Sequence, residues 1–277
     1  MGPIIGKSAP WHMIESDGPT TMLLLDVDGT LVDPSGVLYP GAQYLAKVGR
    51  RAGKIALCSA RPIASLELVG KLLGGADILV GLQGAIACRG TCPPYLWAQP
   101  LKRDELAIVR ALTQSLPLEL WLYDEREWFC DSLSSAVDLE VLTIGISPIA
   151  GRNAPRSAYK LAVVDRSSAA AARLDELRLE LAQQGIRCSR THTHMLEVVA
   201  SAVGPDKGIS RLRLALGKEM TRFVAVGDGE NDIGMLQAAD LAFGFRGTDA
   251  ANATQQSIKV APASEGGLFE ITKLLYG

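Results

Sequence analysis

Two aspartates one residue apart follow an apolar run near the start of the chain. Four apolar residues, 22–25, lead directly into Asp26 and Asp28, and Gly29 comes next. The run does not alternate with polar residues, which predicts a short strand buried on both faces. Because a carboxylate inside such a strand would carry a large desolvation cost, we expect both acids where the strand ends. Gly29 allows a sharp turn and a close backbone approach to an anion, so the segment suggests a divalent metal and a phosphate.

Three further polar segments follow a predicted strand or open a predicted helix. Ser59 and Arg61 follow the apolar run 55–58, and Lys207 opens a predicted helix. Residues 227–232, Gly-Asp-Gly-Glu-Asn-Asp, follow another apolar run. In parallel α/β sheets, ligands bind at the carboxyl edge of the strands. Each segment alone could be an ordinary turn, helix cap or surface lysine, but their order at strand ends favours a catalytic site.

Apolar periodicity predicts alternating strands and helices in the first and last thirds of the chain. In the first third, we expect strands at 22–25, 54–59 and 77–82 and helices at 41–51 and 62–73. In the last third, we expect helices at 208–216, 233–239 and 268–275 and strands at 223–226, 241–245 and 258–260. This alternation is typical of right-handed crossovers and a parallel sheet.

The middle third differs in texture and is predicted to be a self-contained α+β unit. Residues 84–100 are rich in Gly, Cys and Pro, which predicts a linker or a short hairpin. Helices are expected at 104–115 and 167–184, two strands within 118–132, a further strand at 158–164 and antiparallel edge strands at 186–189 and 195–199; 138–146 fits either helix or strand. The chain therefore divides into a split core, 1–83 plus 198–277, and an insert, 84–197, with 1–20 a loose leader.

Composition limits the classes of function. The 277 residues are 48% hydrophobic and 21% charged, enough for one large globular domain or two ordinary ones. A net charge of −2 argues against a nucleic-acid-binding surface, and no apolar run in the sequence reaches membrane-spanning length. The cysteines at 58, 88, 92, 130 and 188 lack metal-ligand spacing, so we expect unpaired thiols, no zinc site and a cytoplasmic location.

In order and spacing, the four polar segments resemble the motifs of the haloacid dehalogenase-like (HAD) superfamily of phosphohydrolases. The insert lies between the second and third segments, as in the branch with a large α/β cap that includes Cof-like and sugar-phosphate phosphatases. The resemblance covers nearly the whole chain except the leader and the details of the cap. It implies an α/β fold in which a Rossmann-like parallel-sheet core carries an inserted α+β cap.

The sequence departs from the family's pattern at three places. Ala60 precedes Arg61 where the family often has Gly-Arg, and Gln83 replaces an Asn at the entry to the cap. Arg246 and Thr248 occupy a stretch where relatives often carry an Asn that supports the phosphate pocket. The last of these differences concerns the wall of the pocket rather than the reaction.

The resemblance implies chemical roles for the two acids of the first segment. Phosphate monoesters hydrolyse very slowly unaided, and a carboxylate nucleophile divides the reaction into two easier steps. Asp26 is expected to be that nucleophile. Asp28 is expected to protonate the leaving alkoxide and then to act as the base for the hydrolytic water.

The resemblance also implies a magnesium site and a phosphate site. Mg²⁺ is a hard cation that prefers carboxylate, substrate and water oxygens. Its expected ligands are Asp26, the backbone carbonyl of Asp28, Asp228 and Asp232. The expected phosphate-binding groups are the Ser59 hydroxyl, the Gly29 amide, the Lys207 ammonium and, supporting them, Asn231. Arg61 either contacts the substrate or cap or forms a structural ion pair.

Substrate choice is expected to come from the cap, because the cap covers the site and excludes water. The candidate contacts are Trp128, Arg152, Arg156, Lys160, Arg190, His192 and His194. Aromatic residues here are more often cap core than substrate platforms. With no third ligand in the sequence, His192 and His194 fit a strand edge better than a metal site.

The sequence therefore predicts a Mg²⁺-dependent phosphomonoesterase that acts on a phosphorylated sugar or similar small metabolite, as a monomer or homodimer. One alternative is a phosphosugar mutase, which would yield an isomeric sugar phosphate instead of free phosphate. A second is a non-catalytic phosphometabolite-binding module, against which Asp28 argues because binding alone needs no acid there. Phosphonate cleavage would need a cap lysine forming a Schiff base, and the sequence singles none out.

Overall fold

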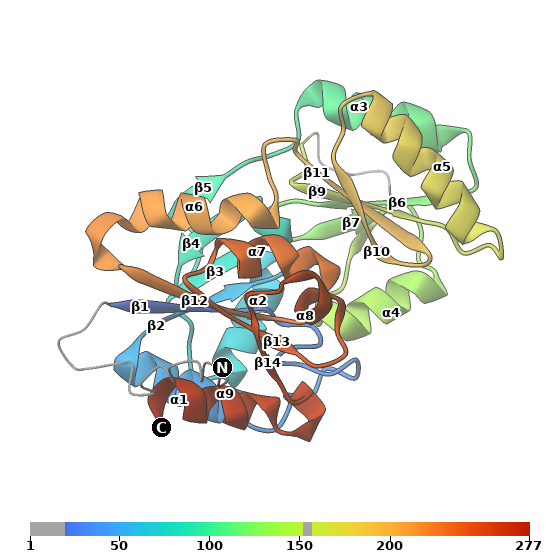
Figure 1. The fold of residues 1–277 in the computed structure, drawn as a ribbon. Coiled ribbons are helices and arrows are strands. Elements are labelled where there is room, and N and C mark those ends of the chain that lie inside the picture. Colours follow the sequence, from blue (N-terminus) through green and yellow to red (C-terminus); the bar gives the residue numbers. More distant parts are fainter. Residues whose placement is uncertain (1–19, 152–156) are drawn as a thin grey trace, which may run out of the picture.

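The computed structural model describes residues 20–151 and 157–277, which form two adjoining lobes (Figure 1). The larger lobe contains strands β1 Thr21–Leu25, β2 Gly53–Cys58, β3 Ile78–Gly81, β4 Ile86–Arg89, β5 Tyr95–Ala98, β12 Arg222–Gly227, β13 Leu241–Phe245 and β14 Ile258–Val260. Its helices are α1 Ala42–Ala52, α2 Ile63–Leu72, α6 Pro205–Leu216, α7 Ile233–Ala238, α8 Asp249–Ala253 and α9 Gly267–Tyr276. The smaller lobe contains β6 Glu119–Tyr123, β7 Trp128–Cys130, β8 Ile149–Ala150, β9 Lys160–Val164, β10 Cys188–His192 and β11 Met195–Val199, with helices α3 Arg103–Gln114, α4 Ser135–Ile144 and α5 Ala170–Gln183.

The larger sheet has the strand order β14-β13-β12-β1-β2-β3-β4-β5. From β14 to β3 neighbouring strands run parallel, whereas β4 and β5 add an antiparallel hairpin at one edge. β1 lies inside the sheet, with Leu25 opposite both Leu57 of β2 and Val226 of β12. This arrangement confirms the predicted α/β fold with a Rossmann-like core.

Helices pack on both faces of this sheet. β1 is buried along its whole length, as its unbroken apolar run predicts. Leu23 and Leu25 face the apolar cluster that α1, α2 and α9 complete, while Met22 and Leu24 face the cluster completed by α6 and α7. Figure 1 shows α1 and α9 side by side below the sheet and α6 above it. The acidic segment after β1 therefore leaves the centre of a well-packed core.

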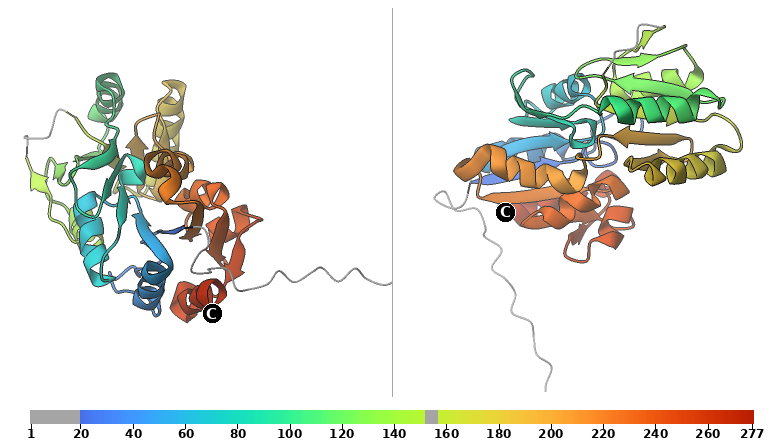
Figure 2. Two further views of the ribbon diagram at one scale, coloured as in Figure 1. Left: turned by 90° about the vertical axis from the view of Figure 1, so that its left-hand side faces the viewer. Right: turned by 90° about the horizontal axis from the view of Figure 1, so that it is seen from above.

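The smaller lobe, here called the cap, is built on a second sheet of order β10-β11-β9-β6-β7-β8. Figure 2 shows α3 and α5 side by side on its outer face, where Leu174 and Leu177 pack with Leu161 and Val163 of β9. Its other face carries large aromatic side chains that belong to the same apolar cluster as β1. The apolar interior is therefore continuous from the core into the cap.

The structure differs from the sequence predictions mainly where the chain enters the cap. Residues 84–100 contain the β4–β5 hairpin, which is one of the two predicted alternatives, but this hairpin pairs with the larger sheet rather than with the sheet of the cap. Cys88 and Cys92 form a disulfide, contrary to the prediction of unpaired thiols. The hairpin brings their Cα atoms to 5.6 Å, within the range that a disulfide spans.

Three smaller differences concern single elements. Most of the undecided segment 138–146 is helical, because residues 138–144 form the main part of α4, which Ser134 caps. Strand β11 is not edge material, because it pairs with both β10 and β9. Helix α8 was not predicted. Of the predicted leader 1–20, residues 1–19 lie outside the described part of the chain.

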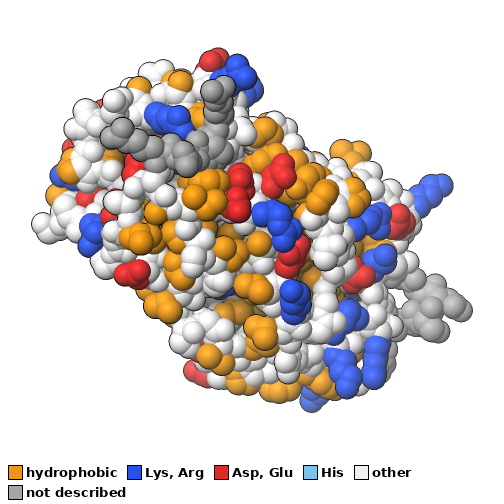
Figure 3. Space-filling view, turned by 180° about the vertical axis from the view of Figure 1, so that it is seen from behind, with side chains coloured by type: hydrophobic (Ala, Val, Ile, Leu, Met, Phe, Trp, Pro, Cys, Tyr) orange, Lys and Arg blue, Asp and Glu red, His pale blue; other side chains and the backbone are white. Residues whose placement is uncertain are grey.

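The molecular surface mixes apolar and charged side chains. On the face shown in Figure 3, hydrophobic side chains are interspersed with Lys, Arg, Asp and Glu. Within residues 20–151 and 157–277, no helix is both long and apolar enough to cross a membrane.

Candidate active site

The ends of β1, β2 and β12 bring three of the predicted segments to one edge of the larger sheet. Leu25 lies in register with Leu57 and Val226, so Asp26 follows between the two neighbouring strand ends. The Asp26 amide donates to the Val226 carbonyl at 3.0 Å, which extends the pairing by one residue. Side chains far apart in the sequence therefore converge where the carboxyl edge of a parallel sheet is expected to bind ligands.

Asp26, Asp228 and Asp232 form an acidic cluster at this edge. One carboxylate oxygen of each lies within 4.8 Å of the others. Thr30 Oγ1 donates to Asp228 Oδ1 at 2.9 Å, a contact between the first and fourth segments that the sequence did not predict. Asp232 Oδ2 accepts from the amides of Asp228 at 3.0 Å and Gly229 at 2.9 Å, so it also shapes the loop that carries Asp228.

Gly29 makes room for this cluster. Its φ of +82° lies in the left-handed region, and a Cβ built at this position would overlap the Asp228 carboxylate. Its amide donates to the Val32 carbonyl at 2.9 Å, inside its own turn. The amide is thus used within the turn, so its predicted contact with a phosphoryl oxygen stays a prediction and requires this bond to open. The structure also gives the glycine a steric role.

Burial and mutual repulsion disfavour charge on the three acids. Asp26 is 3% and Asp232 4% exposed. Burial, followed by the charges of Asp232, Asp228 and Asp28, raises the pKa of Asp26 well above its ordinary value of 3.8. Burial also raises the pKa of Asp228, and it raises the pKa of Asp232 to about 7. Three such carboxyls are costly to ionise together unless they share a proton or a cation.

The cluster fits a magnesium ion. Mg²⁺ holds hard oxygen ligands at about 2.1 Å, so two ligands on opposite sides lie about 4.2 Å apart. The carboxylate oxygens of Asp26, Asp228 and Asp232 lie within 4.8 Å of one another, close to that spacing. A divalent cation would also offset the repulsion that raises their pKa values.

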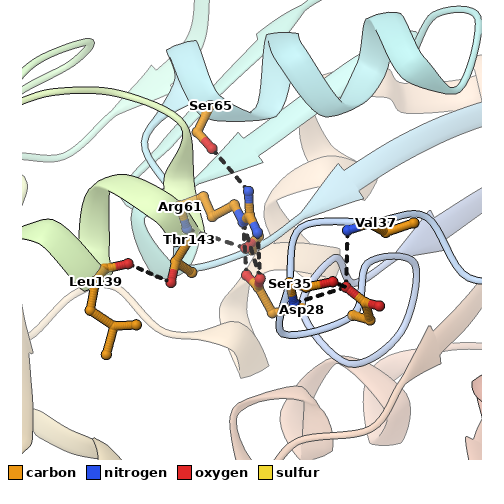
Figure 4. A network of polar contacts seen from close by, with 9 residues as sticks. Asp28, Ser35, Val37, Arg61, Ser65, Leu139 and Thr143 are labelled. Carbon is orange, nitrogen blue, oxygen red and sulfur yellow. Dashed lines mark hydrogen bonds and ion pairs between the residues drawn. The ribbon is translucent and has the colours of Figure 1, made fainter.

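Asp28 lies beside the cluster but is paired with Arg61. Figure 4 shows Arg61, in the loop that leads into α2, reaching Asp28. Arg61 Nε donates to Asp28 Oδ2 at 2.9 Å and Nη2 to Oδ1 at 2.6 Å, while Nη1 donates to Ser65 Oγ at 3.3 Å. Of the two alternatives for Arg61, the structure has the ion pair. Both carboxylate oxygens of Asp28 accept hydrogen bonds from Arg61, so proton transfer between Asp28 and a ligand requires this pair to open.

A pocket opens beside the acidic cluster, between the sheet and helices α6 and α7. Ser59, Asn231 and Asp232 lie in its wall, together with Gln83 and apolar side chains of the sheet and both helices. Ser59 Oγ accepts from the Arg61 amide at 3.2 Å, which leaves the hydroxyl hydrogen free to donate to a ligand. The structure therefore brings two predicted phosphate-binding side chains to the same place as a predicted metal ligand.

Lys207 lies in the first turn of α6, next to Gly208 in the pocket wall. Its ammonium donates to the Ser201 carbonyl at 3.4 Å, in the segment that returns from the cap to the core. The sequence predicted a phosphoryl oxygen of the substrate as the partner of this ammonium. The contact of Lys207 with a phosphoryl group stays a prediction. It requires the Lys207 side chain to rotate away from Ser201.

The cap candidates have different surroundings. Trp128 is fully buried and donates its indole N–H to the Ile146 carbonyl at 2.9 Å, so it is part of the cap core. Arg190 donates to the carbonyls of Ala171 and Thr193. Lys160 is buried and contacts both lobes. Arg152, Arg156 and the side chain of His192 lie outside the described part of the structure, and the His194 carbonyl accepts the Asp165 amide.

Solved structures share this fold along nearly the whole chain. A haloacid dehalogenase-like hydrolase from Bacteroides thetaiotaomicron has a TM-score of 0.79 and 20% identity over 94% of this chain and 100% of its own. A HAD/Cof-like hydrolase from Plasmodium vivax has a TM-score of 0.80 and 19% identity, covering 94% and 96%. A structure described as a HAD subclass IIB sugar phosphatase has a TM-score of 0.74 and 18% identity, covering 92% and 98%.

Sequence comparison agrees with the structural likeness. A phosphoglycolate phosphatase of Methanococcoides burtonii is 24% identical over 243 residues, which cover 86% of this chain and 87% of that protein. The model of the haloacid dehalogenase-like hydrolase family matches residues 23–263, a range that contains the acidic cluster, Ser59 and Lys207. As its four polar segments predicted, the chain belongs to the family of haloacid dehalogenase-like hydrolases.

Proposed function

We propose that the protein is a Mg²⁺-dependent phosphomonoesterase that forms an aspartyl-phosphate intermediate on Asp26. The observation that carries this proposal is the convergence of Asp26, Asp228 and Asp232 within 4.8 Å at the carboxyl edge of the parallel sheet. Ser59 and Asn231 line the adjoining pocket and suit a phosphoryl group. The substrate is proposed to be a phosphorylated sugar or a similar small metabolite, held under a cap formed by roughly the segment between β5 and α6.

In the first half of the reaction, an Asp26 carboxylate oxygen attacks phosphorus and the alkoxide leaves with a proton from Asp28. In the second half, Asp28 accepts a proton from water as that water attacks the acyl phosphate, which releases inorganic phosphate and restores Asp26. The Ser59 hydroxyl and, after a rotation, the Lys207 ammonium would bind phosphoryl oxygens. Proton transfer by Asp28 follows release from Arg61, its partner at 2.6 Å.

The predicted Mg²⁺ would be held by Asp26 and Asp228, with Asp232 as a further ligand or anchor and the backbone carbonyl of Asp28 as another oxygen. When bound, it supplies positive charge that lets an anionic carboxylate approach an anionic phosphoryl group. The Asp232 carboxylate keeps the loop of Asp228 in place through its two amide hydrogen bonds.

The test is release of inorganic phosphate from a panel of phosphorylated metabolites, with Mg²⁺ and with chelator. The panel includes sugar phosphates, because of the sugar phosphatase of similar fold, and phosphoglycolate, because of the curated relative. We expect Asp26→Asn to abolish release and Asp33→Asn to leave it unchanged. Asp33 is a suitable control because its carboxylate accepts hydrogen bonds from Ser35 and Val37 within its own turn.

Each alternative has its own result in this assay. An isomeric sugar phosphate formed without free phosphate would identify a mutase. Binding of phosphorylated metabolites without turnover of any would identify a binding module. Release that persists in chelator or in Asp26→Asn would contradict the proposed mechanism. A cytoplasmic location and a monomeric or homodimeric state remain predictions from the sequence.

A further inference from the structure

Lys160, at the start of β9 in the cap, has a buried ammonium that contacts the core. Its side chain is 3% exposed. The ammonium donates to the Ala60 carbonyl at 3.0 Å and to Glu197 Oε1 at 2.5 Å, and it lies 4.1 Å from the centre of the Tyr123 ring. A cap lysine is therefore bonded to the backbone of the loop that follows β2.

That loop, residues 59–61, has three successive carbonyls bound by groups of the cap or of the segment leading to it. Lys160 binds the middle carbonyl. The Gln83 amide donates to the first at 3.2 Å, and the Leu82 amide donates to the third at 3.0 Å. The path of the loop is thus fixed from the side of the cap connection.

The turn that supplies these amides is strained and is held by the same carboxylate as Lys160. Leu82 has a φ of +52° and Gln83 a φ of +56°, both uncommon for residues other than glycine. The Gln83 side-chain amide donates to Glu197 Oε2 and, at 3.1 Å, to Ser189 Oγ. Glu197, on β11, therefore joins the outgoing chain, the returning chain and Lys160.

The same loop carries the groups that act at the candidate active site. Ser59 Oγ lies in the pocket wall and accepts from the Arg61 amide, and Arg61 binds Asp28 through two hydrogen bonds. A shift of the Ala60 carbonyl would move its two neighbours. The position of the cap is in this way connected to the position of Asp28.

The buried ion pair between Lys160 and Glu197 is not required for the stability of the fold. Removing two charges from water costs several kcal/mol per ion, and apolar replacements of buried pairs are often as stable or more so. What the Lys160–Glu197 pair supplies that apolar side chains cannot is a directed donor to the Ala60 carbonyl and a directed acceptor for Gln83.

We propose that Lys160 is a positioning residue, which orients loop 59–61 from the seated cap and so aligns Ser59 and the Arg61–Asp28 pair for turnover. The effect on turnover rests on the proposed phosphatase function, but the effect on the loop does not. A single Lys160 variant would leave Glu197 buried without its cation, so the test uses the double variant Lys160→Met/Glu197→Gln.

The matched control removes a comparable ion pair that stays within the cap. Arg173 Nη1 donates to Asp165 Oδ2 at 2.8 Å, and the Asp165 side chain is fully buried. Arg173→Met/Asp165→Asn thus deletes the same kinds of group without touching loop 59–61. Both double variants are compared with the wild type by steady-state kinetics and by hydrogen exchange of the Leu82 and Gln83 amides, which report the bonds to the loop.

For Lys160→Met/Glu197→Gln we expect a fall in kcat of about 10- to 100-fold with KM changed by less than about threefold, because aligned groups are lost rather than binding. We also expect faster exchange of the two amides, and neither effect in the control. Unchanged exchange, unchanged kcat, or equal effects in the control would overturn the proposal. If the wild type releases no phosphate from any substrate, the proposed function fails, and hydrogen exchange alone decides whether Lys160 orients the loop.

Discussion

At the scale of single residues, the acidic cluster depends on the absence of a side chain at Gly29. Gly29 and Gly36 have nearly the same left-handed backbone, with φ of +82° and +83°. A Cβ at Gly29 would overlap Asp228, whereas a Cβ at Gly36 would come no closer than 4.0 Å to another heavy atom. The two positions therefore separate backbone strain from steric displacement of the cluster.

We expect Gly36→Ala to lower the melting temperature by about 2–4 °C, from roughly 1 kcal/mol of backbone strain. Gly29→Ala carries the same strain and also pushes Asp228 away. We expect it to destabilise the protein further and to weaken Mg²⁺ binding at least about tenfold, measured by calorimetric titration. Equal Mg²⁺ affinity in the two variants would show that Asp228 is not a metal ligand.

Asp28 forms an ion pair with Arg61 in the structure, whereas its proposed role is that of a general acid and base. It is held by Arg61, yet a general acid must carry a proton at the leaving oxygen. Asp28→Asn keeps the shape and a partial contact with Arg61 but cannot transfer the proton. We expect phosphate release to fall by about 10²- to 10⁴-fold, while binding of a phosphorylated metabolite, measured by calorimetry, changes little. Unchanged release would remove Asp28 from the mechanism.

At the scale of elements, the sequence predicted the strands, which have a local apolar pattern. It did not predict hydrogen bonds between residues that are far apart in the chain. The continuous apolar runs of β1, β2 and β12 were predicted correctly, because burial on both faces leaves a local signature. The bond from Thr30 to Asp228 spans 198 positions and has no such signature. The same holds for the link from Gln83 to Glu197, in which a non-glycine residue takes a left-handed turn that propensity argues against.

The entry to the cap was the least predictable element. Glycine, cysteine and proline in 84–100 predicted a linker or a short hairpin; the structure has the hairpin, but the sequence did not show that it adds β4 and β5 to the core sheet. Cys88 and Cys92 pair only because this hairpin places them together. Spacing alone did not reveal the pairing, since the geometry comes from the sheet edge and not from the sequence.

The loops after β1 and β12 carry buried carboxyl groups whose negative charges repel one another. Bound protons or a bound cation would offset this repulsion. These buried acids have pKa values raised above 3.8, that of Asp232 to about 7. A folded-state pKa above the unfolded value makes the folded state bind protons more tightly. The stabilising contribution is therefore complete below about pH 4 and is lost as pH rises toward about 7.

We expect the metal-free protein to lose melting temperature across this pH window and saturating Mg²⁺ to restore about 5–10 °C at pH 7.5, with a smaller gain at pH 5. Asp232→Asn removes one titrating group and should flatten the pH dependence of the metal-free protein. Differential scanning fluorimetry with Mg²⁺ or chelator measures both effects. A Mg²⁺ gain that is the same at both pH values would argue against these carboxyls as the site.

At the scale of the whole molecule, core and cap share one apolar interior. Trp121, Tyr123 and Trp128 on the inner face of the cap sheet belong to the same buried cluster as Leu25 of β1. Arg126, in the turn between β6 and β7, also binds both carboxylate oxygens of Glu67 on α2, at 2.7 and 3.0 Å. The cap is therefore attached to the core by packing and polar contacts as well as by its two connections.

This continuity predicts that core and cap unfold together, although separate lobes commonly unfold in separate steps. In a Trp11→Phe/Trp97→Phe variant, Trp121 and Trp128 are the remaining tryptophans, and both lie in the cap. Their emission would then follow the cap, while far-ultraviolet circular dichroism follows the whole chain. We expect the two thermal or urea transitions to coincide, because the aromatic cluster loses its packing partners as soon as β1 and its neighbours separate. An earlier tryptophan transition would mean that the cap melts from a core that stays folded, and the shared interior would then add little to stability.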